Sequence, residues 1–337
     1  MRPMDVPSAR GEVTEILIAR LTAGERAPLD DLAATTTAAL AASDDVLTDD
    51  DLQLALFLMY ELHYGGLDGV ADTWEWDPRL LAVRERIERE FEAALRRAVS
   101  QPRATRDVSE ALFALVTDDD GPSLSAFVER DATAEQVREI LACRTIYTLK
   151  EADPHSWAIP RLHGRAKSAL VEIQADEYGG GRPERLHATI FAAALRGAGL
   201  DDRYGAYADH VPATVYTSMN LMSLFGLHRR LRGAIVGHLA AYEMTSSLPC
   251  RAYATGLRRL GFGDDVTDYF DEHVEADAVH EQLAARDLAG SLADDEPEIA
   301  NDILFGAAAC LAIDGRLWGG LRERFEVGES ALRKPLP

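Results

Sequence analysis

The stretch VTDYFDEHVEADAVHEQLAARDL places two histidines and an aspartate on one side of a predicted helix. His273, Asp277 and His280 follow one another at steps of four and three residues, and they share a stripe with the apolar Val266 and Phe270. Buried imidazole and carboxylate groups are costly unless one partner satisfies them together, and a divalent ion such as iron accepts both ligand types. The trio therefore predicts metal ligands. The alternative is a polar helix face whose histidines are hydrogen-bonded or solvated.

Two further carboxylates interrupt apolar stripes elsewhere in the second half of the chain. In LRGAIVGHLAAYEMTSS, Glu243 continues the stripe of Ile235 and Leu239, and an unpaired buried carboxylate needs a partner. Glu151 ends a similar stripe that passes through Tyr147. Both glutamates are candidate ligands, although Glu151 also fits a solvated residue at a helix end.

A triple glycine separates Glu177 from His187 in DEYGGGRPERLHATI. Glycines allow the backbone to bend closely around a site, and Pro183 suits the first turn of a new helix, although an ordinary loop remains the alternative. Glu184 competes with Glu177, because Glu184 and His187 form the Glu-x-x-His pair of ferritin-like di-iron bundles. We prefer Glu177, since Glu184 lies in the polar run RPER, which we expect to be exposed.

The elements that position these residues are predicted to be helices throughout. Helical periodicity runs from Glu12 to about Val116, and the strongest break in this half is the run DDDGP at residues 118–122. No strand-like alternation or fixed repeat is visible. We predict an all-α protein with a helical N-terminal domain at 1–130 and a helical bundle at 131–337. The helices expected in the second half cover about 133–151, 166–178, 183–198, 213–225, 229–246, 251–260, 264–289 and 296–318.

Composition excludes several classes of function. The formal charge of −22 over 337 residues disfavours nucleic acid and anionic membranes as partners. The N-terminus lacks the apolar segment of a signal peptide, and no stretch approaches the roughly 20 apolar residues of a membrane span. We therefore expect a cytoplasmic protein. Cys143, Cys250 and Cys310 lie far apart in apolar surroundings and are interpreted as buried small hydrophobic residues.

Taken together, the candidate ligands resemble the ligand set of the haem-oxygenase-like di-iron oxidases and oxygenases. The resemblance covers about residues 133–292 and is most specific at DEYGGG with the histidine that follows, around the glutamate of AAYEMTSS, and in the H-x3-D-x2-H trio. By ligand spacing the chain is most similar to the N-oxygenating members. The ligand set so implied is Glu151, Glu177, His187, Glu243, His273, Asp277 and His280.

The resemblance implies a helical bundle shaped like haem oxygenase but without haem, holding two Fe(II) ions. The extra carboxylate of the N-oxygenating members is matched by Glu151 or Glu177. An N-oxygenating relative also has a helical N-terminal domain that supports dimerisation, which suits residues 1–130 and predicts a homodimer. That relative carries a C-terminal cupin domain, and we expect none here, because the sequence ends at Pro337.

The expected function is therefore oxygen activation through a peroxide-level intermediate, with N-oxygenation of a small amine or amino acid to a hydroxylamine, nitroso or nitro product in a biosynthetic pathway. The electrons are expected from an external donor, because no GxGxxG dinucleotide loop is present. One alternative is oxidative C–C cleavage or decarboxylation of an aliphatic acid or amino acid. The alternative from another class is a non-catalytic helical protein that binds iron or a partner.

Arginines close to the predicted site helices are candidates for holding a substrate carboxylate, which arginine binds bidentately. They are Arg229, Arg230, Arg232 and Arg251, and the alternative is that they are surface charges. The remaining histidines are expected to have no role as ligands, with a supporting role possible only for His238 beside a ligand helix. These are His63, His155, His163, His210, His228 and His238.

Overall fold

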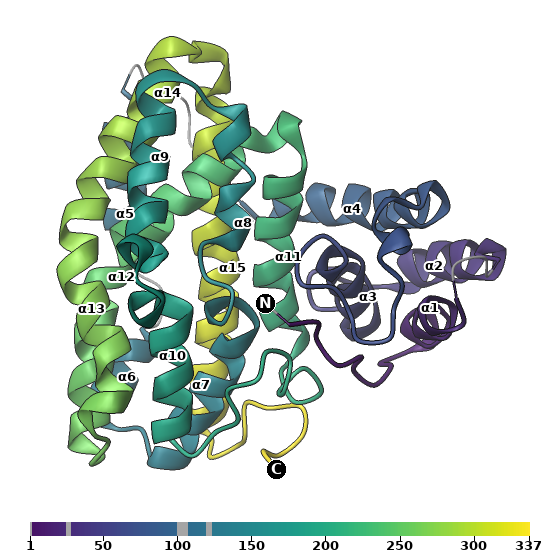
Figure 1. Cartoon of the computed structure of the whole chain (residues 1–337), viewed down its shortest axis with the longest axis horizontal. Coiled ribbons are helices and arrows are strands. Elements are labelled where there is room, and N and C mark those ends of the chain that lie inside the picture. Colours follow the sequence, from purple (N-terminus) through teal and green to yellow (C-terminus); the bar gives the residue numbers. More distant parts are fainter. Residues whose placement is uncertain (1, 25–27, 100–106, 119–122) are drawn as a thin grey trace.

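Helices supply every regular element of the part of the chain that the computed structural model describes, which confirms the all-α prediction. The described residues are 2–24, 28–99, 107–118 and 123–337, without the side chains of residues 275–279. A single isolated backbone bridge, between Met4 and Leu67, is the only strand-like pairing among them. Figure 1 shows a bundle of long helices with a group of shorter N-terminal helices packed on one side.

The N-terminal group is built around a buried helix, α3, which packs against α1, α4 and the bundle helix α11. Asp49 caps α3 by accepting hydrogen bonds from two backbone N–H groups. Asp77 caps α4 by accepting from the Arg79 N–H, and Pro78 occupies the first turn. The elements of this group are α1 (Glu12–Thr22), α2 (Asp30–Ala42), α3 (Asp50–Glu61), the 3-10 turn η1 (Asp72–Trp76) and α4 (Pro78–Ala98).

The bundle is centred on two long helices, α12 and α15, which pack closely along their length. A side chain at Gly237 would place its Cβ 1.8 Å from the carbonyl oxygen of Ile303, and one at Gly306 would lie 1.9 Å from that of Ala234. The two glycines therefore allow the helix backbones to touch. The bundle helices are α5 (Val108–Thr117), α6 (Leu124–Arg130), α7 (Ala134–Thr148), α8 (Asp153–Ser156), α9 (Gly164–Glu177), α10 (His187–Gly197), α11 (Ala213–Leu227), α12 (Arg232–Arg259), α13 (Asp264–Gln282), α14 (Ser291–Asp295) and α15 (Ala300–Glu326).

Short elements connect these helices, and some of them correct the predicted boundaries. Helix α12 continues through Pro249 where two helices were expected, because packing against its neighbours offsets the one backbone hydrogen bond that proline removes. The predicted helix at 264–289 is divided between α13 and a π-helical segment. The remaining short elements are the 3-10 turns η2 (Ile159–Arg161), η3 (Gly179–Gly181), η4 (Pro183–Arg185), η5 (Arg229–Leu231) and η7 (Pro297–Ile299), and the π-helical η6 (Leu283–Gly290).

Helices α5 and α6, which lie within the N-terminal domain predicted at 1–130, pack against bundle elements. Helix α6 contacts α12 and α15, and α5 contacts α12, α15 and η6. Part of the break predicted near the boundary, residues 119–122, lies outside the described residues. The separation into domains at 1–130 and 131–337 stays a prediction.

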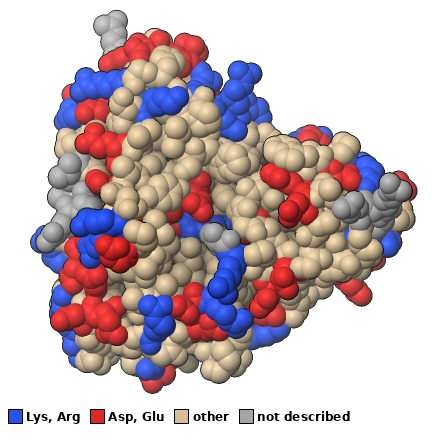
Figure 2. All heavy atoms as spheres, viewed as in Figure 1, with Lys and Arg blue, Asp and Glu red and all other residues tan. Residues whose placement is uncertain are grey.

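One described helical stretch, Pro297–Glu326, is long and apolar enough to cross a membrane by length and composition, although the sequence analysis expected none. Most of its apolar window is buried inside the molecule, as in the central helix of a helical bundle. On the face shown in Figure 2, acidic and basic side chains are interspersed over both parts of the molecule.

A buried ion pair joins the N-terminal group to the bundle. Lys150 Nζ contacts Glu61 Oε1, with both side chains fully buried, and Tyr204 donates a hydrogen bond of 2.9 Å to the same carboxylate. The Lys150 ammonium also lies 4.2 Å from the ring centroid of Tyr64. Because Lys150 directly precedes Glu151, this ion pair fixes the chain beside a predicted ligand.

We predict that replacing only Lys150 destabilises the protein more than replacing both Lys150 and Glu61. Lys150→Met leaves the Glu61 carboxylate buried without its counter-charge, and we expect a loss of about 3–5 kcal/mol in the free energy of unfolding. The double variant Glu61→Gln/Lys150→Met should recover part of that loss in urea denaturation of the metal-free protein. Arg89→Met, which removes an exposed ion pair to Glu85, is the control and should change little. A Lys150→Met variant as stable as this control would contradict the prediction.

Candidate metal centre

Six of the seven predicted ligands lie close together inside the bundle, at helix ends and on two long helices. The side chain of the seventh, Asp277, lies outside the described residues. Glu177 is the last residue of α9, and His187 is the first residue of α10. Glu243 comes from the middle of α12, and α13 carries both His273 and His280. Glu151 was expected at the end of a helix, but α7 ends at Thr148, so Glu151 lies in the turn that follows.

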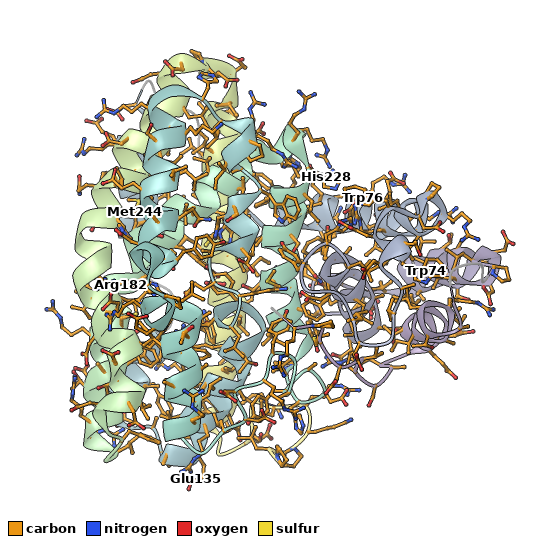
Figure 3. All side chains as sticks on the ribbon, viewed as in Figure 1. Trp74, Trp76, Glu135, Arg182, His228 and Met244 are labelled. Carbon is orange, nitrogen blue, oxygen red and sulfur yellow. The ribbon has the colours of Figure 1, made fainter. Side chains whose placement is uncertain are left out.

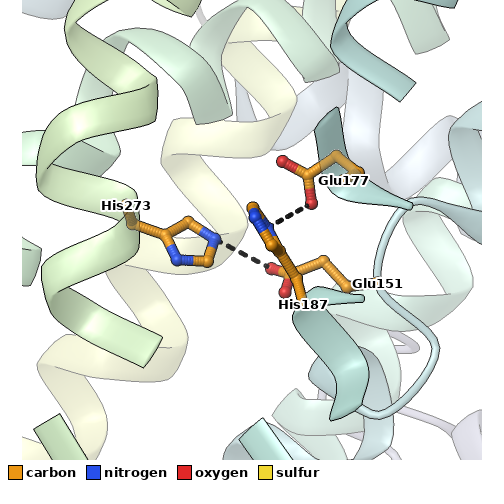
Figure 4. Close-up of side chains that lie close together, drawn as sticks. All are labelled: Glu151, Glu177, His187 and His273. Atoms are coloured by element: carbon orange, nitrogen blue, oxygen red, sulfur yellow. Dashed lines mark ion pairs between the residues drawn. The ribbon is translucent and has the colours of Figure 1, made fainter. Parts of the chain in front are cut away.

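One group of candidate donors consists of Glu151, Glu177, His187 and His273, whose donor atoms all lie within 4.8 Å of one another. His187 Nδ1 lies 2.9 Å from Glu177 Oε2, and His273 Nε2 lies 3.8 Å from Glu151 Oε1. Figure 4 shows the four side chains pointing toward one another from separate segments. Two imidazoles and two carboxylates in this arrangement match the preferences of iron.

A second group shares one carboxylate with the first. Donor atoms of Glu177, Glu243 and His280 also lie within 4.8 Å of one another, and His280 Nδ1 is 3.3 Å from Glu243 Oε2. All three residues are buried. Glu177 therefore belongs to both sets of donors.

The donor atoms in both groups lack other partners, which supports occupation by metal. Within these two groups, four buried atoms have no aligned hydrogen-bond partner: Glu177 Oε2, His187 Nδ1, His273 Nε2 and His280 Nδ1. Buried polar atoms are normally hydrogen-bonded, and each exception needs a cause. Here the four atoms face one another across a short distance, so cations between them would satisfy all four. The residues present therefore fit a pair of metal ions.

The backbone that follows Glu177 and Glu151 is unusual, and it brings these glutamates to the site. Gly179 has a φ of +71°, and a Cβ there would lie 2.6 Å from the backbone carbon of Arg185, so only glycine allows the loop to close on itself. Ala152, next to Glu151, has a φ of +73°, which costs a non-glycine residue about 1–3 kcal/mol. A hydrogen bond of 2.9 Å from Gln174 Nε2 to the Ala152 carbonyl oxygen holds that turn.

Residues behind the ligands orient them. His273 donates its Nδ1–H to the Tyr269 carbonyl oxygen at 2.7 Å, which leaves Nε2 as the ligand atom. Tyr269 also donates its hydroxyl to the Glu151 carboxylate at 2.8 Å. On the other side, His280 Nε2 lies 3.0 Å from Asp176, so Nδ1 faces the site. The sequence analysis did not identify Tyr269 and Asp176. Two features could have indicated them: Tyr269 lies four residues before His273, and Asp176 directly precedes Glu177.

Without metal, burial and mutual charge shift the pKa values of the ligands in opposite directions. Burial and the neighbouring Glu177 raise the pKa of Glu151 to about 8. Burial opposes protonation of His187 and His280, yet nearby carboxylates, chiefly Glu177 and Glu243 respectively, raise both pKa values to about 9. Burial lowers the pKa of His273 to about 4. The metal-free centre therefore holds protons where metal ions would supply positive charge.

The competing ligand Glu184 lies outside the two donor groups, and the four arginines predicted to bind substrate are exposed or paired with carboxylates. Glu184 is exposed in η4, as expected from its polar surroundings. Arg230 forms an exposed ion pair with Glu92 of α4 at 2.5 Å, and Arg232 pairs with Glu296. Arg229 and Arg251 are exposed. The assignment of these arginines to substrate binding stays a prediction.

The remaining histidines lie outside the two donor groups, but several have partners that local spacing did not indicate. His155 Nε2 and His238 Nδ1 lie 3.1 Å apart beside Tyr242, and burial lowers the pKa of His155 to about 4. His228, at the junction between the N-terminal group and the bundle (Figure 3), lies 3.0 Å from the buried Glu88. These partners come from distant segments, so only the tertiary structure identifies them. The three cysteines are buried, as predicted.

We predict that Glu177→Ala removes most of the bound iron, because this carboxylate belongs to both donor groups. Glu243→Ala alters only the second group and should retain more iron. Glu184→Ala is the matched control from the same connecting segment and should retain the full content. The iron content of the three variants, measured by plasma emission spectroscopy after anaerobic loading with Fe(II), checks this ranking. Full retention in Glu177→Ala with loss in Glu184→Ala would reverse the assignment.

The metal-free protein should lose stability as the pH rises. His187 and His280 have pKa values raised from 6.5 to about 9, so their contribution is complete below pH 6.5 and is lost as the pH rises through 9. The pKa of Glu151 is raised from 4.5 to about 8, so its contribution to stability is also lost as the pH rises through this range. We expect the midpoint temperature of thermal unfolding to decrease as the pH is raised from 6.5 to 9. Anaerobic Fe(II)-loaded protein should show a smaller decrease in this midpoint temperature, because metal replaces the protons. An equal dependence on pH with and without Fe(II) would contradict this prediction.

Two comparisons with known proteins agree with this geometry. The sequence profile described as "Iron-containing redox enzyme" matches residues 138–315, which is more than half of the chain and contains all seven predicted ligands. Nitrosourea synthase from Streptomyces achromogenes subsp. streptozoticus is 33% identical over 139 residues, which is 40% of this chain and 29% of the synthase. The chain thus matches less than a third of the length of that relative. The resemblance expected from the ligand pattern is confirmed at the level of the family: the chain belongs to the haem-oxygenase-like family of iron-containing redox enzymes.

Proposed function

We propose that the protein is a non-haem di-iron oxygenase that uses O2 to oxidise a nitrogen atom of a small amine or amino acid. The observation that carries this proposal is the place of Glu177, which is shared by two groups of buried carboxylate and imidazole donors. A mononuclear site does not require a carboxylate shared by two such groups. Membership of a family of iron-containing redox enzymes supports iron as the metal.

In this proposal Glu151, Glu177, His187 and His273 would hold one iron ion, and Glu177, Glu243 and His280 would hold the other, with Asp277 as a further candidate ligand. Bound Fe(II) would supply the redox chemistry that dioxygen activation requires. The protein itself contributes a fixed arrangement of ligands. Tyr269 holds the Glu151 carboxylate, and its carbonyl oxygen fixes the ring of His273, so the donor atoms need little rearrangement on metal binding.

The burial of the centre supports chemistry rather than iron storage. Side-chain exposure is 2% for His187 and His280, 8% for Glu177 and Glu243, and 10% for Glu151. A site this enclosed excludes bulk water from the reacting atoms and strengthens electrostatic interactions with them. An iron-storage site, by contrast, must admit and release ions. We infer that substrate enters a dry region beside the ligands, and that an external reductant supplies the electrons.

The choice of nitrogen as the oxidised atom is supported by the similarity to nitrosourea synthase. That relative is named for a product that contains an oxidised nitrogen, and the 33% identity extends over 139 residues. Six ligands of the set expected for an N-oxygenating member lie together in the structure, including both Glu151 and Glu177. The alternative reaction, oxidative C–C cleavage of an aliphatic acid or amino acid, is distinguished by its products.

The test combines iron analysis with product analysis under 18O2. We expect about two irons per chain, oxygen uptake that depends on substrate, and 18O in a hydroxylamine, nitroso or nitro product from a panel of amines and amino acids. His280→Ala should abolish product formation, and Glu184→Ala should not. A cleaved alkene or decarboxylated product without N-oxidation would replace the proposal by the alternative reaction. Iron binding without oxygen uptake in the presence of any substrate and reductant would indicate a non-catalytic protein.

A further inference from the structure

A hydrogen-bonded network of four side chains joins the two segments that carry Glu151 and Glu177. Two of the side chains come from the short helix α8, which begins two residues after Glu151. The other two come from the end of α9, three residues before Glu177 and one residue after it. The network therefore connects the two segments directly beside their candidate ligands. Its members, which we call the clamp, are Asp153, Ser156, Gln174 and Tyr178.

The clamp forms a chain of hydrogen bonds with a single donor direction. The buried Gln174 donates from Nε2 to Ser156 Oγ at 2.7 Å, and Tyr178 donates its hydroxyl to Asp153 Oδ1 at 2.9 Å. The hydroxyl oxygens of Ser156 and Tyr178 lie 2.8 Å apart, and Ser156 must be the donor there, because the Tyr178 proton is already used. Each hydroxyl thus accepts one hydrogen bond and donates one. Chains of this kind strengthen cooperatively, so the four side chains behave as one unit.

The clamp also restrains the strained residue next to Glu151. The Gln174 amide that begins the chain donates a second hydrogen bond, of 2.9 Å, to the Ala152 carbonyl oxygen. Ser156 Oγ lies 3.3 Å from the same oxygen. Ala152 has a left-handed backbone, which a residue with a side chain adopts only when its surroundings hold it there. The clamp therefore fixes the backbone from which the Glu151 side chain leaves.

Glu151 and Glu177 need such a restraint because they repel each other when no metal is bound. Their donor atoms lie within 4.8 Å of one another, and burial, followed by the charge of Glu177, raises the pKa of Glu151 to about 8. Glu151 lies in a turn and Glu177 is the last residue of α9, whereas His273 lies within α13. Helical hydrogen bonds thus restrain the two glutamates less than they restrain the histidine. Without the clamp, repulsion would move the carboxylates apart.

We propose that the clamp positions the metal centre, by keeping the Glu151 and Glu177 carboxylates close enough to bind one ion before that ion arrives. None of its four side chains belongs to either donor group of the described residues, so they act as positioning residues through the turn at Ala152 and the end of α9. Donors that are already in place bind more tightly, because less of the interaction energy is spent on rearrangement. The inference rests on metal binding, which is part of the proposed function, and not on the atom that is oxidised.

A purely structural role would have a different consequence. If the clamp only stabilised the fold, its loss would lower the thermal stability of the metal-free and metal-loaded protein equally and leave the affinity for metal unchanged. A positioning role instead lowers the affinity for metal, and it reduces the increase in thermal midpoint that Fe(II) loading produces. The metal-free protein loses little, because separation of the two carboxylates relieves their repulsion.

Anaerobic calorimetry with Fe(II), together with absorption spectra of the Co(II)-loaded protein, tests the proposal. Tyr178→Phe interrupts the chain between Ser156 and Asp153, and Gln174→Met removes the donor at its start. We expect each variant to bind Fe(II) about tenfold more weakly than the unaltered protein, which is the effect of about one hydrogen bond. Each should also change the visible bands of bound Co(II), since these bands report the arrangement of the ligands.

Conservative variants and a control separate the hydrogen bonds from the bulk of the side chains. Ser156→Thr keeps a hydroxyl and Asp153→Asn keeps an acceptor oxygen, so both should retain Fe(II) affinity within about threefold, whereas Ser156→Ala should lose about tenfold. Tyr207→Phe is the matched control. It removes a buried hydroxyl that accepts a hydrogen bond of 2.7 Å from the Asp201 backbone N–H, outside the clamp, and should leave Fe(II) affinity and the Co(II) bands unchanged.

The outcomes distinguish the clamp from the proposed function. Unchanged Fe(II) affinity in Tyr178→Phe, Gln174→Met and Ser156→Ala, or an equal loss in Tyr207→Phe, would overturn the proposal. An unaltered protein that binds neither Fe(II) nor Co(II) would overturn the clamp together with the proposed function. Metal binding with the expected order of variants, but without an N-oxidised product, would support the clamp and reject only the proposed reaction.

Discussion

One electrostatic constraint governs the candidate metal centre. Several carboxylates and imidazoles are buried together, and they have too few hydrogen-bond partners to satisfy them. Glu177 lies within both donor groups, and its Oε2 has no aligned hydrogen bond. Burial of such groups is strongly unfavourable unless a positive charge compensates them. Protons provide part of this charge in the metal-free protein, as the raised pKa values of His187 and His280 indicate. Bound metal would provide it more fully.

The rest of the bundle holds these groups in place through chain segments that are themselves constrained. Glu151 follows a helix end and precedes Ala152, whose backbone is left-handed, while Glu177 precedes Gly179, where only glycine fits. The turn at Glu151 is further fixed by the buried Lys150–Glu61 ion pair, which reaches from the bundle to α3. The N-terminal helices therefore contribute to the geometry of the centre although they supply none of its described ligands.

The sequence by itself determined the all-helical class and the identity of most candidate ligands, because helical periodicity shows which polar residues fall on apolar stripes. His273, His280 and Glu243 could be selected in this way, and the glycines after Glu177 marked a tight turn. Only the tertiary structure decided which donors share a group, that Glu177 and not Glu184 lies among them, and that Glu151 lies beyond its helix. It also revealed Tyr269 and Asp176 as neighbours of the centre. The physical reason is that periodicity reports the face of one helix, whereas distances between side chains depend on how several helices pack, where each one ends, and which buried charges find partners across the bundle.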